Sequence, residues 1–329
     1  MRERPEGASS VSPVSDLDSA VRAVVRDCLG VSADEDVLVI CNTATWDLAE
    51  RLRAEAEEAG ADAVLALMAE RDSHAAEPPA PLAAAMSAAD VVLAPTVQSL
   101  SHTAARKAAT EAGVRIATLP GVTEDMLARV MSADMGELRR RGRAIADRLT
   151  AGLQAQITCP NGSELLLGLG DREAIPDAGE LTRRGAFGNL PCGEGFIAPV
   201  EGTTEGTLVV DGSIAGVGIP GEPVELTVER GHLVAATGEE GGRLMELLTA
   251  HGADGTNVAE LGIGSNEKAK LTGEVLEDEK ILGTAHVAFG ASAAIGGTVQ
   301  VPVHLDCIVL KPEVSVDGEP LVRAGELLV

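Results

Sequence analysis

The chain has 329 residues, of which 45% are hydrophobic, enough for the cores of two domains of about 150 residues each. Its formal net charge is −25, and so acidic a surface repels the phosphate groups of nucleic acids and of anionic lipids. Nucleic acid and membranes are therefore excluded as expected partners.

Helical and strand patterns alternate in the first half of the chain, after a polar tail, residues 1–14, that we expect to be disordered. The spacing of apolar residues predicts helices at 17–28, 48–59, 100–112 and 138–153, and strands at 36–40, 63–68, 91–94 and 114–118. Thr123 can cap a further helix. Strands separated by helices predict an α/β domain, residues 15–152, whose mostly parallel sheet is covered on both faces.

Short strands separated by Gly, Pro, Asp and Asn dominate the second half. Apolar runs predict strands at 154–159, 165–169, 196–200, 206–210, 224–228 and 232–236, and one helix at 242–249 interrupts them. More strands are expected up to the C-terminus. We therefore expect residues 153–329 to form a β-rich α+β domain, and this domain carries the candidate metal ligands.

Cysteine usage and apolar runs indicate the compartment. The five cysteines are scattered and none forms a CxxC pair, which argues against both a disulfide framework and a thiolate zinc site. The N-terminal residues lack the apolar core of a signal peptide, and no apolar run approaches the roughly 20 residues needed to span a bilayer. We therefore expect a cytoplasmic protein.

The strongest functional signal is the sequence His304-Leu305-Asp306 within an apolar run, residues 301–310, that is typical of a buried strand. Because side chains alternate along a strand, His304 and Asp306 point to the same side. A histidine and a carboxylate beside a core are unfavourable unless something binds them. A divalent cation is the expected partner, since imidazole and carboxylate are common metal ligands.

Two further segments place a polar side chain on the face of a strand that points away from the core. Glu260 shares its face with Gly262 and Gly264, and glycines beside a carboxylate leave room for a ligand or a metal to approach. His286 also faces away from its apolar neighbours. A glutamate facing water and a hydrogen-bonded structural histidine are the ordinary alternatives.

Glu194 and Glu279 complete a carboxylate-rich set. Each alone is typical of a solvated turn, since Glu194 lies between glycines and Glu279 belongs to an acidic run. On the polar faces of adjacent strands, however, they and the two histidines together predict a metal site. His102 could line a cleft, but a structural role for its neighbours Ser101 and Thr103 at a helix start fits equally well.

The order and spacing of these residues resembles the aminopeptidase T and aminopeptidase S family of dinuclear metallopeptidases. The resemblance covers residues 185–312 well and residues 96–125 more loosely. Its motifs are matched by Gly188-Asn189-Leu190-Pro191, Gly193-Glu194, Ala198-Pro199, Ala259-Glu260-Leu261-Gly262-Ile263-Gly264, Asn266, Thr272-Gly273, Leu276-Glu277-Asp278-Glu279-Lys280, Leu282-Gly283-Thr284-Ala285-His286 and His304-Leu305-Asp306.

The resemblance implies six metal ligands, which are Glu194, Glu260, Glu279, His286, His304 and Asp306. Glu260 would bridge two divalent ions, Zn, Co or Mn, and a hydroxide shared by the ions would attack the substrate carbonyl. Glu260 and Glu194 would then be the catalytic carboxylates of a metal-dependent aminopeptidase or related amide hydrolase that acts on small peptides. A homodimer that encloses an internal cavity is also implied.

Two features depart from that family. The chain is shorter than typical members, mostly in its first half, and Ala293 stands where the family has a tyrosine seven residues after its first ligand histidine; the chain contains no tyrosine. A phenol at that position would donate a hydrogen bond to the oxyanion, and losing such a donor costs about 10²–10³ in turnover. Ser292, Lys268 and Lys270 are candidates to replace it.

A family of ring-cleaving dihydroxypyridine dioxygenases shares this scaffold, which keeps a second hypothesis open. His286, His304 and Asp306 would supply the two histidines and one carboxylate that hold a single Fe(II) in non-haem oxygenases, and the missing tyrosine favours such a divergence. The three retained glutamates favour the dinuclear hydrolase, since one iron does not need them. A non-catalytic relic of the fold is the third hypothesis.

Overall fold

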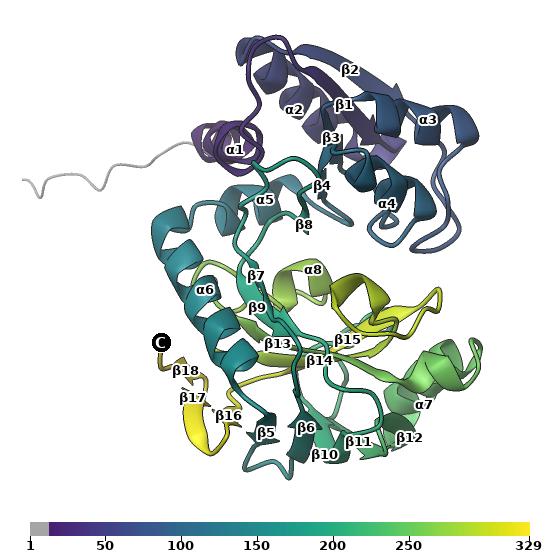
Figure 1. The fold of residues 1–329 in the computed structure, drawn as a ribbon, viewed down its shortest axis with the longest axis vertical. Helices are drawn as coiled ribbons and strands as arrows, with labels where there is room; N and C mark the ends of the chain where they lie inside the picture. The colour runs from purple at the N-terminus through teal and green to yellow at the C-terminus, as the bar shows by residue number, and fades with distance from the viewer. Residues whose placement is uncertain (1–12) are drawn as a thin grey trace, which may run out of the picture.

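The computed structural model describes residues 13–329. Of the tail expected at residues 1–14, residues 1–12 lie outside the described residues. Within that part the strands form one parallel sheet of five strands and two antiparallel sheets, of eight and five strands (Figure 1). The expected fold class, an α/β part with a parallel sheet followed by a β-rich part, is confirmed. None of the helices in residues 13–329 is long and apolar enough to cross a bilayer.

The parallel sheet has the strand order β2-β1-β3-β4-β8. Its strands are β1 (Asp36–Cys41), β2 (Asp62–Leu67), β3 (Val91–Ala94), β4 (Arg115–Thr118) and β8 (Phe187–Asn189). The helices of this half are α1 (Pro13–Arg22), η1 (Ala23–Cys28), η2 (Thr43–Thr45), α2 (Trp46–Glu58), α3 (Ala80–Ala88), α4 (Ala104–Glu111) and α5 (Glu124–Val130).

Both faces of the parallel sheet are covered, as predicted, because successive side chains of a strand enter different cores. Val37 and Val39 pack in the core that contains residues of α1, α2 and α5. Leu38 and Ile40 pack in a second core with residues of α3 and α4. As predicted, Thr123 caps a helix, because its hydroxyl accepts a hydrogen bond from the N–H of Met126 in α5.

Strand β8 comes from the later part of the chain yet pairs with β4 at the edge of the parallel sheet. The chain then runs within a few residues into β9 of an antiparallel sheet, so the two halves meet at this point (Figure 1). The division expected after residue 152 remains a prediction.

The eight-stranded sheet contains β5 (Gln154–Thr158), β6 (Glu164–Gly168), β10 (Glu205–Val210), β11 (Val224–Glu229), β12 (His232–Ala236), β16 (Glu313–Val316), β17 (Glu319–Arg323) and β18 (Glu326–Leu327). The five-stranded antiparallel sheet contains β7 (Ile175–Asp177), β9 (Glu194–Ile197), β13 (Val258–Gly264), β14 (Ala285–Gly290) and β15 (His304–Val309). The helices here are α6 (Met135–Ala151), α7 (Gly238–Thr249), η3 (Ala253–Thr256), α8 (Val275–Asp278) and η4 (Ala293–Ile295).

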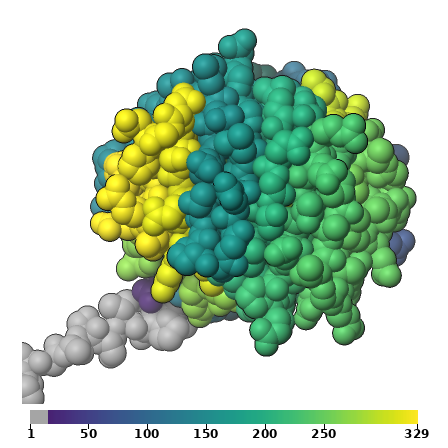
Figure 2. Space-filling view, turned by 90° about the horizontal axis from the view of Figure 1, so that it is seen from below, coloured from purple at the N-terminus to yellow at the C-terminus, as the bar shows by residue number. Residues whose placement is uncertain are grey.

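The two antiparallel sheets share one core, which decides where polar residues lie. Leu261 and Ile263 of β13 and Val287 of β14 are buried in it together with residues of the eight-stranded sheet, α6 and α7. Glu260 and His286 therefore lie on the opposite face of their strands. Seen from below, the C-terminal strands (yellow) lie beside the teal residues near 150–170, as the pairing of β16 with β5 requires (Figure 2).

Candidate metal centre

Each predicted ligand on the five-stranded sheet lies opposite a glycine or an alanine of the neighbouring strand. The cross-strand pairs are Glu194 with Gly264, His286 with Gly262, Glu260 with Ala288, Asp306 with Ala288 and His304 with Gly290. A Cβ atom on Gly262 would lie 2.0 Å from Nε2 of His286. The room that this glycine leaves is therefore filled by the imidazole of His286.

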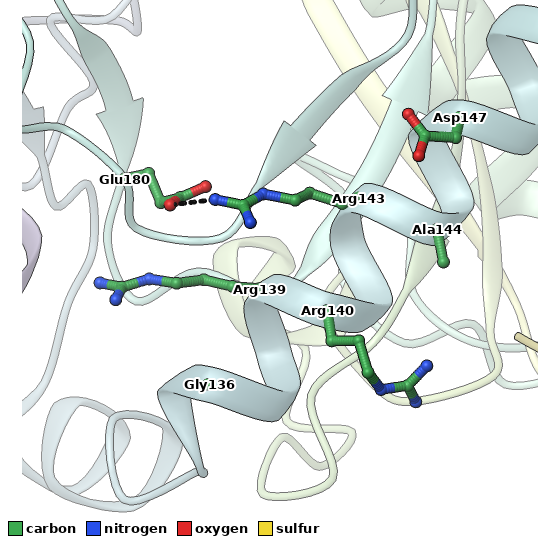
Figure 3. A pocket seen from close by; sticks show the side chains of 7 residues that line it. All are labelled: Gly136, Arg139, Arg140, Arg143, Ala144, Asp147 and Glu180. Carbon is green, nitrogen blue, oxygen red and sulfur yellow. Dashed lines mark hydrogen bonds and ion pairs between the residues drawn. The ribbon is translucent and has the colours of Figure 1, made fainter.

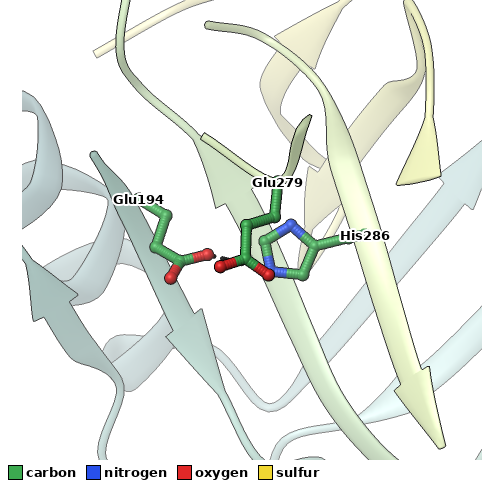
Figure 4. Close-up of side chains that lie close together, drawn as sticks. All are labelled: Glu194, Glu279 and His286. Carbon is green, nitrogen blue, oxygen red and sulfur yellow. Dashed lines mark ion pairs between the residues drawn. The ribbon is translucent and has the colours of Figure 1, made fainter. Parts of the chain in front are cut away.

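The structure brings all six predicted ligands together in two groups of three. Glu260, His304 and Asp306 form one group, which we call the Glu260 cluster, and Glu194, Glu279 and His286 form the other, the Glu194 cluster. Within each cluster the potential ligand atoms lie within 4.8 Å of one another. The side chains of the Glu194 cluster converge from β9, β14 and the residue after α8 (Figure 4).

Glu260 lies between the two histidines. Its Oε1 is 3.3 Å from Nε2 of His286, and its Oε2 is 3.3 Å from Nε2 of His304. His286 Nε2 also lies 3.0 Å from Oε2 of Glu194, and His304 Nε2 lies 3.6 Å from Oδ1 of Asp306. The position expected for a bridging carboxylate is thus occupied by Glu260, while its metal-binding role remains a prediction.

The charges of the site are strongly coupled. Burial opposes the charged form of His286, but the adjacent carboxylates of Glu194 and Glu260 outweigh burial and raise its pKa well above the usual value. Burial likewise opposes the charge of Glu260, yet its hydrogen bonds to His286 and His304 lower the pKa of this carboxyl. Glu260 is thus in the deprotonated form in which a carboxylate binds a metal, whereas His286 must lose a proton before it can bind one.

Two buried polar atoms test whether this donor set fits a metal. Among residues 13–329, Oε2 of Glu194 and Nδ1 of His286 have no hydrogen-bond partner, although Oε2 of Glu194 faces the imidazole of His286. Buried polar atoms are normally satisfied. Nitrogen and oxygen donors at this spacing suit a divalent transition metal, and the orphaned carboxylate oxygen is consistent with that ligand.

A buried lysine that the sequence did not single out supports the Glu194 cluster. Lys280 is 0% exposed in its side chain, and its Nζ donates hydrogen bonds to Oε1 of Glu194 and, at 2.6 Å, to Oε1 of Glu279. It also lies 3.4 Å from Oδ2 of Asp177. Burial raises the pKa of Asp177 to about 7, against the opposing charge of Lys280. The only sequence signal for this lysine is its place directly after the acidic run.

The acidic run around Glu279 is not a solvated turn, because its members are buried and each has its own partner. Glu277 pairs with Arg129 of α5 and so connects the two halves of the chain. Asp278 is 0% exposed and accepts hydrogen bonds from the backbone N–H groups of Thr272 and Gly273 at 2.7 and 2.8 Å. These contacts fix the segment that presents Glu279.

His102 reaches the Glu260 cluster from the first half of the chain. Its ring stacks on that of His304, with centroids 5.6 Å apart and planes inclined by 28°. Thr103 caps α4 by accepting the N–H of Arg106, so the structural role expected at this helix start is confirmed, while the lining of a cleft by His102 remains a prediction. Desolvation lowers the pKa of His102 to about 4, and the charge of His304 acts in the same direction, although the residue as a whole is exposed.

Two of the three proposed substitutes for the missing tyrosine, Ser292 and Lys270, have other partners. Ala293 lies exposed in η4. The hydroxyl of Ser292 donates to Oε1 of Glu201 at 3.3 Å, and Lys270 is 57% exposed in its side chain, 3.8 Å from Asp125. The structure therefore offers no support for an oxyanion donor at Ser292 or Lys270.

Two hollows of the surface are lined by none of the six predicted ligands. One is lined mainly by residues of α6, with Arg139 and Arg143 extending to the side of Glu180 and Arg140 pointing away from it (Figure 3). Arg143 pairs with Glu180, and Arg140 pairs with Glu137. Because these ion pairs offset the positive charge, and because the donor clusters lie elsewhere, we place the chemistry at the clusters.

Comparison with known proteins identifies a family and a curated relative that match most of the chain. Residues 16–329 match a family model described as NicX: 2,5-dihydroxypyridine 5,6-dioxygenase. The 2,5-dihydroxypyridine 5,6-dioxygenase of Pseudomonas putida is 25% identical over 263 residues, which cover 74% of this chain and 72% of that protein.

Two solved structures share the fold. The structure of 2,5-dihydroxypyridine dioxygenase from Pseudomonas putida has a TM-score of 0.83 and 20% identity, covering 97% of this chain and 98% of that one. Wild-type AmpT from Thermus thermophilus has a TM-score of 0.73 and 20% identity, covering 97% of this chain and 100% of that one. At this identity the likeness shows the fold alone.

The family match contradicts the aminopeptidase or amide hydrolase that the motifs predicted, and with it the peptide substrate and the classification as a hydrolase and protease. The prediction was wrong because AmpT and the dioxygenase have the same fold, and one fold can serve different reactions. The sequence motifs around the predicted ligands therefore do not distinguish peptide hydrolysis from ring cleavage. The ring-cleaving dioxygenase, our second hypothesis, is better supported.

Proposed function

The chain belongs to the NicX family, described as 2,5-dihydroxypyridine 5,6-dioxygenase, and from this premise we propose that it is a metal-dependent, ring-cleaving dioxygenase. Its substrate would be a dihydroxypyridine or a closely related dihydroxylated nitrogen heterocycle. The observation that carries the proposal is the buried Glu260 cluster with the ring of His102 stacked beside it. This arrangement combines metal donors with a flat aromatic neighbour.

We assign the ferrous ion to Glu260, His304 and Asp306. This donor set differs from the expected combination of His286, His304 and Asp306, because Glu260 is the residue that shares a cluster with His304 and Asp306. One imidazole and two carboxylates suit a divalent first-row metal. When bound, ferrous iron would supply the redox chemistry through which dioxygen reacts with an aromatic ring.

The Glu194 cluster offers a second set of three donors, which is why two divalent ions per chain remain part of the proposal. Lys280 already neutralises part of its charge through Oε1 of Glu194 and Oε1 of Glu279. Zn, Co or Mn would suit such nitrogen and oxygen ligands. Elemental analysis distinguishes one ion from two, and light scattering tests the expected homodimer.

The chain's own residues would bind and deprotonate the substrate. Because His304 covers one face of the His102 ring, a substrate at the Glu260 cluster would meet the edge of that ring, where its nitrogen atoms lie. Because the pKa of His102 is lowered to about 4, its imidazole is neutral at pH 7 and can accept the proton of a ring hydroxyl. His304 donates from Nδ1 to the carbonyl oxygen of Ala291 at 2.8 Å, which leaves Nε2 for the metal.

A substrate panel tests the proposal. Protein loaded anaerobically with Fe(II) would be mixed with aerated 2,5-dihydroxypyridine, catechol, 2-hydroxypyridine or an aminoacyl nitroanilide, and the loss of ring absorbance or release of nitroaniline recorded. We expect the dihydroxylated nitrogen heterocycle to be consumed and the anilide to remain intact. Inertness toward a set of dihydroxylated heterocycles at full iron occupancy would refute the proposal.

A further inference from the structure

The segment that connects β14 to β15, residues 291–303, orients one of the candidate ligands; we call it the ligand loop. The carbonyl oxygen of Ala291 lies 2.8 Å from Nδ1 of His304. Because a carbonyl only accepts, this contact holds the proton on Nδ1 and leaves Nε2 free, 3.3 Å from Glu260. The position of Ala291 therefore fixes which nitrogen of His304 faces the cluster.

Two side chains from outside the ligand loop hold it in place. Glu201, between β9 and β10, accepts hydrogen bonds through Oε1 from the N–H of Thr298 at 2.6 Å and from the hydroxyl of Ser292 at 3.3 Å. Arg172, between β6 and β7, donates to Oε2 of Glu201 and to the carbonyl oxygen of Gly296. We call this pair the Arg172–Glu201 anchor.

The Arg172–Glu201 anchor is tightly packed, and it contacts the ligand loop at Ser292, the residue next to Ala291. The side chains of Arg172 and Glu201 are only 19% and 24% exposed. A Cβ atom on Gly297 would lie 2.1 Å from Oγ of Ser292 and 3.0 Å from Oε1 of Glu201, so the contact has no room for a larger residue. The loop is thus held by charge, hydrogen bonding and close packing at once.

We propose that Arg172 and Glu201 are positioning residues for the Glu260 cluster. They fix the ligand loop, the loop fixes the carbonyl of Ala291, and this carbonyl orients His304 toward the metal. The members of the Glu194 cluster lie outside the loop, so loss of the anchor would weaken metal binding at the Glu260 cluster selectively. The proposal rests on the proposed function only in taking the Glu260 cluster as a metal site.

Cobalt binding tests this selectivity, because Co(II) accepts the same nitrogen and oxygen donors and its visible absorption reports their geometry. We expect Glu201→Ala and Arg172→Met to weaken one Co(II) site by about 10–100-fold, the usual effect of removing an outer partner of a ligand. The Co(II) absorption of that site should change, and amide hydrogen exchange should rise in residues 291–303. Glu201→Gln retains an oxygen acceptor for Thr298, so it should restore part of the affinity.

Gly297→Ala disturbs the same contact by steric clash while both charges remain, and we expect the same selective loss. The matched controls are Glu35→Ala and Arg53→Met. Glu35 accepts the N–H of Ser32 and pairs with Arg115 at 20% side-chain exposure. Arg53 pairs with Glu50 at 23% exposure. Both controls should bind Co(II) like the wild type.

Faster exchange in residues 291–303 with unchanged Co(II) affinity and absorption would overturn the proposal, since the anchor would then be merely structural. An equal weakening of Co(II) binding in Glu35→Ala would overturn it too, because the effect would reflect general destabilisation. Neither measurement requires turnover. A cobalt effect in a protein that cleaves no heterocycle would therefore refute the proposed function and leave the anchor's role intact.

Discussion

His102 and His304 stack ring on ring, with centroids 5.6 Å apart and planes inclined by 28°. His102 comes just before α4, beside the parallel sheet, whereas His304 opens β15 in an antiparallel sheet. The contact thus joins the two halves of the chain at a candidate metal ligand. A planar substrate bound beside the Glu260 cluster would touch residues from both halves.

Replacing His102 removes the group that we expect to accept the substrate's proton. We expect His102→Gln to lower kcat at pH 7 by about 10²–10⁴-fold, the usual contribution of a general base, with unchanged metal content. Stopped-flow absorbance and elemental analysis measure the two quantities, and His251→Gln, at an exposed loop position, is the control. Wild-type turnover in His102→Gln would show that His102 is not the base.

The same residue predicts a pH dependence. The pKa of His102 is lowered to about 4, so its ring is neutral at pH 7 and becomes protonated as the pH falls through that value. A protonated imidazole cannot accept a proton, and kcat of the metal-loaded protein should therefore fall toward pH 4. Metal content must be recorded at each pH, because protonated ligands release metal. An acid limb that is unaltered in His102→Gln would contradict this assignment.

Glu260 faces both histidines, so its charge matters to both clusters. Glu260→Gln keeps the size of the side chain but removes the negative charge between Nε2 of His286 and Nε2 of His304. We expect it to lose at least one metal ion and nearly all ring cleavage, as elemental analysis and product assays would show. Glu267→Gln, in a partly exposed pair with Arg141, should retain both properties. Full metal content and turnover in Glu260→Gln would rule out its role as a ligand.

Gly262 leaves the space that His286 occupies. In Gly262→Ala the new Cβ would lie 2.0 Å from Nε2 of His286, so the ring must move, and we expect a loss of about 1–3 kcal/mol in unfolding free energy and weaker metal binding. Urea denaturation and Co(II) titration measure these effects. Gly242→Ala, in helix α7 with nothing within 4 Å, should instead stabilise by roughly 0.5–1 kcal/mol. Equal behaviour of the two variants would contradict the packing argument.

Lys280 is surrounded by carboxylates and has no access to solvent. Lys280→Met leaves Glu194, Glu279 and Asp177 without their shared cation, and breaking a buried ion pair on one side costs about 3–5 kcal/mol. Lys270→Met is the matched control, since Lys270 is 57% exposed in its side chain and an exposed pair contributes about 0–1 kcal/mol. Denaturation at equal metal occupancy measures the unfolding free energy of both variants. Similar values for Lys280→Met and Lys270→Met would contradict a stabilising role of Lys280.

Much of the site could be predicted because strand alternation determines which residues share a face. His304 and Asp306 are two residues apart on a strand, and the apolar neighbours of Glu260 and His286 indicate which face is buried. Residues 80–88 were harder to predict, because an alanine-rich helix such as α3 lacks an apolar and polar alternation. Pairing of β8 with β4 depends on tertiary contacts that local patterns do not contain.

The reaction could not be predicted, for a different physical reason. One fold can serve different reactions, so the order and spacing of the six predicted ligands do not reveal the substrate. Lys280 and Asp177 were missed because charged residues are usually exposed, and their burial depends on contacts with Glu194 and with each other, which lie far apart in the chain. The stacking of His102 on His304 likewise joins distant segments.

The most direct test of ring cleavage is the origin of the oxygen in the product. Iron-loaded protein would turn over 2,5-dihydroxypyridine under ¹⁸O₂, and the product would be analysed at once by mass spectrometry. A dioxygenase places both atoms of dioxygen in the ring-opened product, so we expect a product that carries two labels. A product without label from ¹⁸O₂, or one labelled only when the reaction is run in H₂¹⁸O, would contradict the dioxygenase assignment.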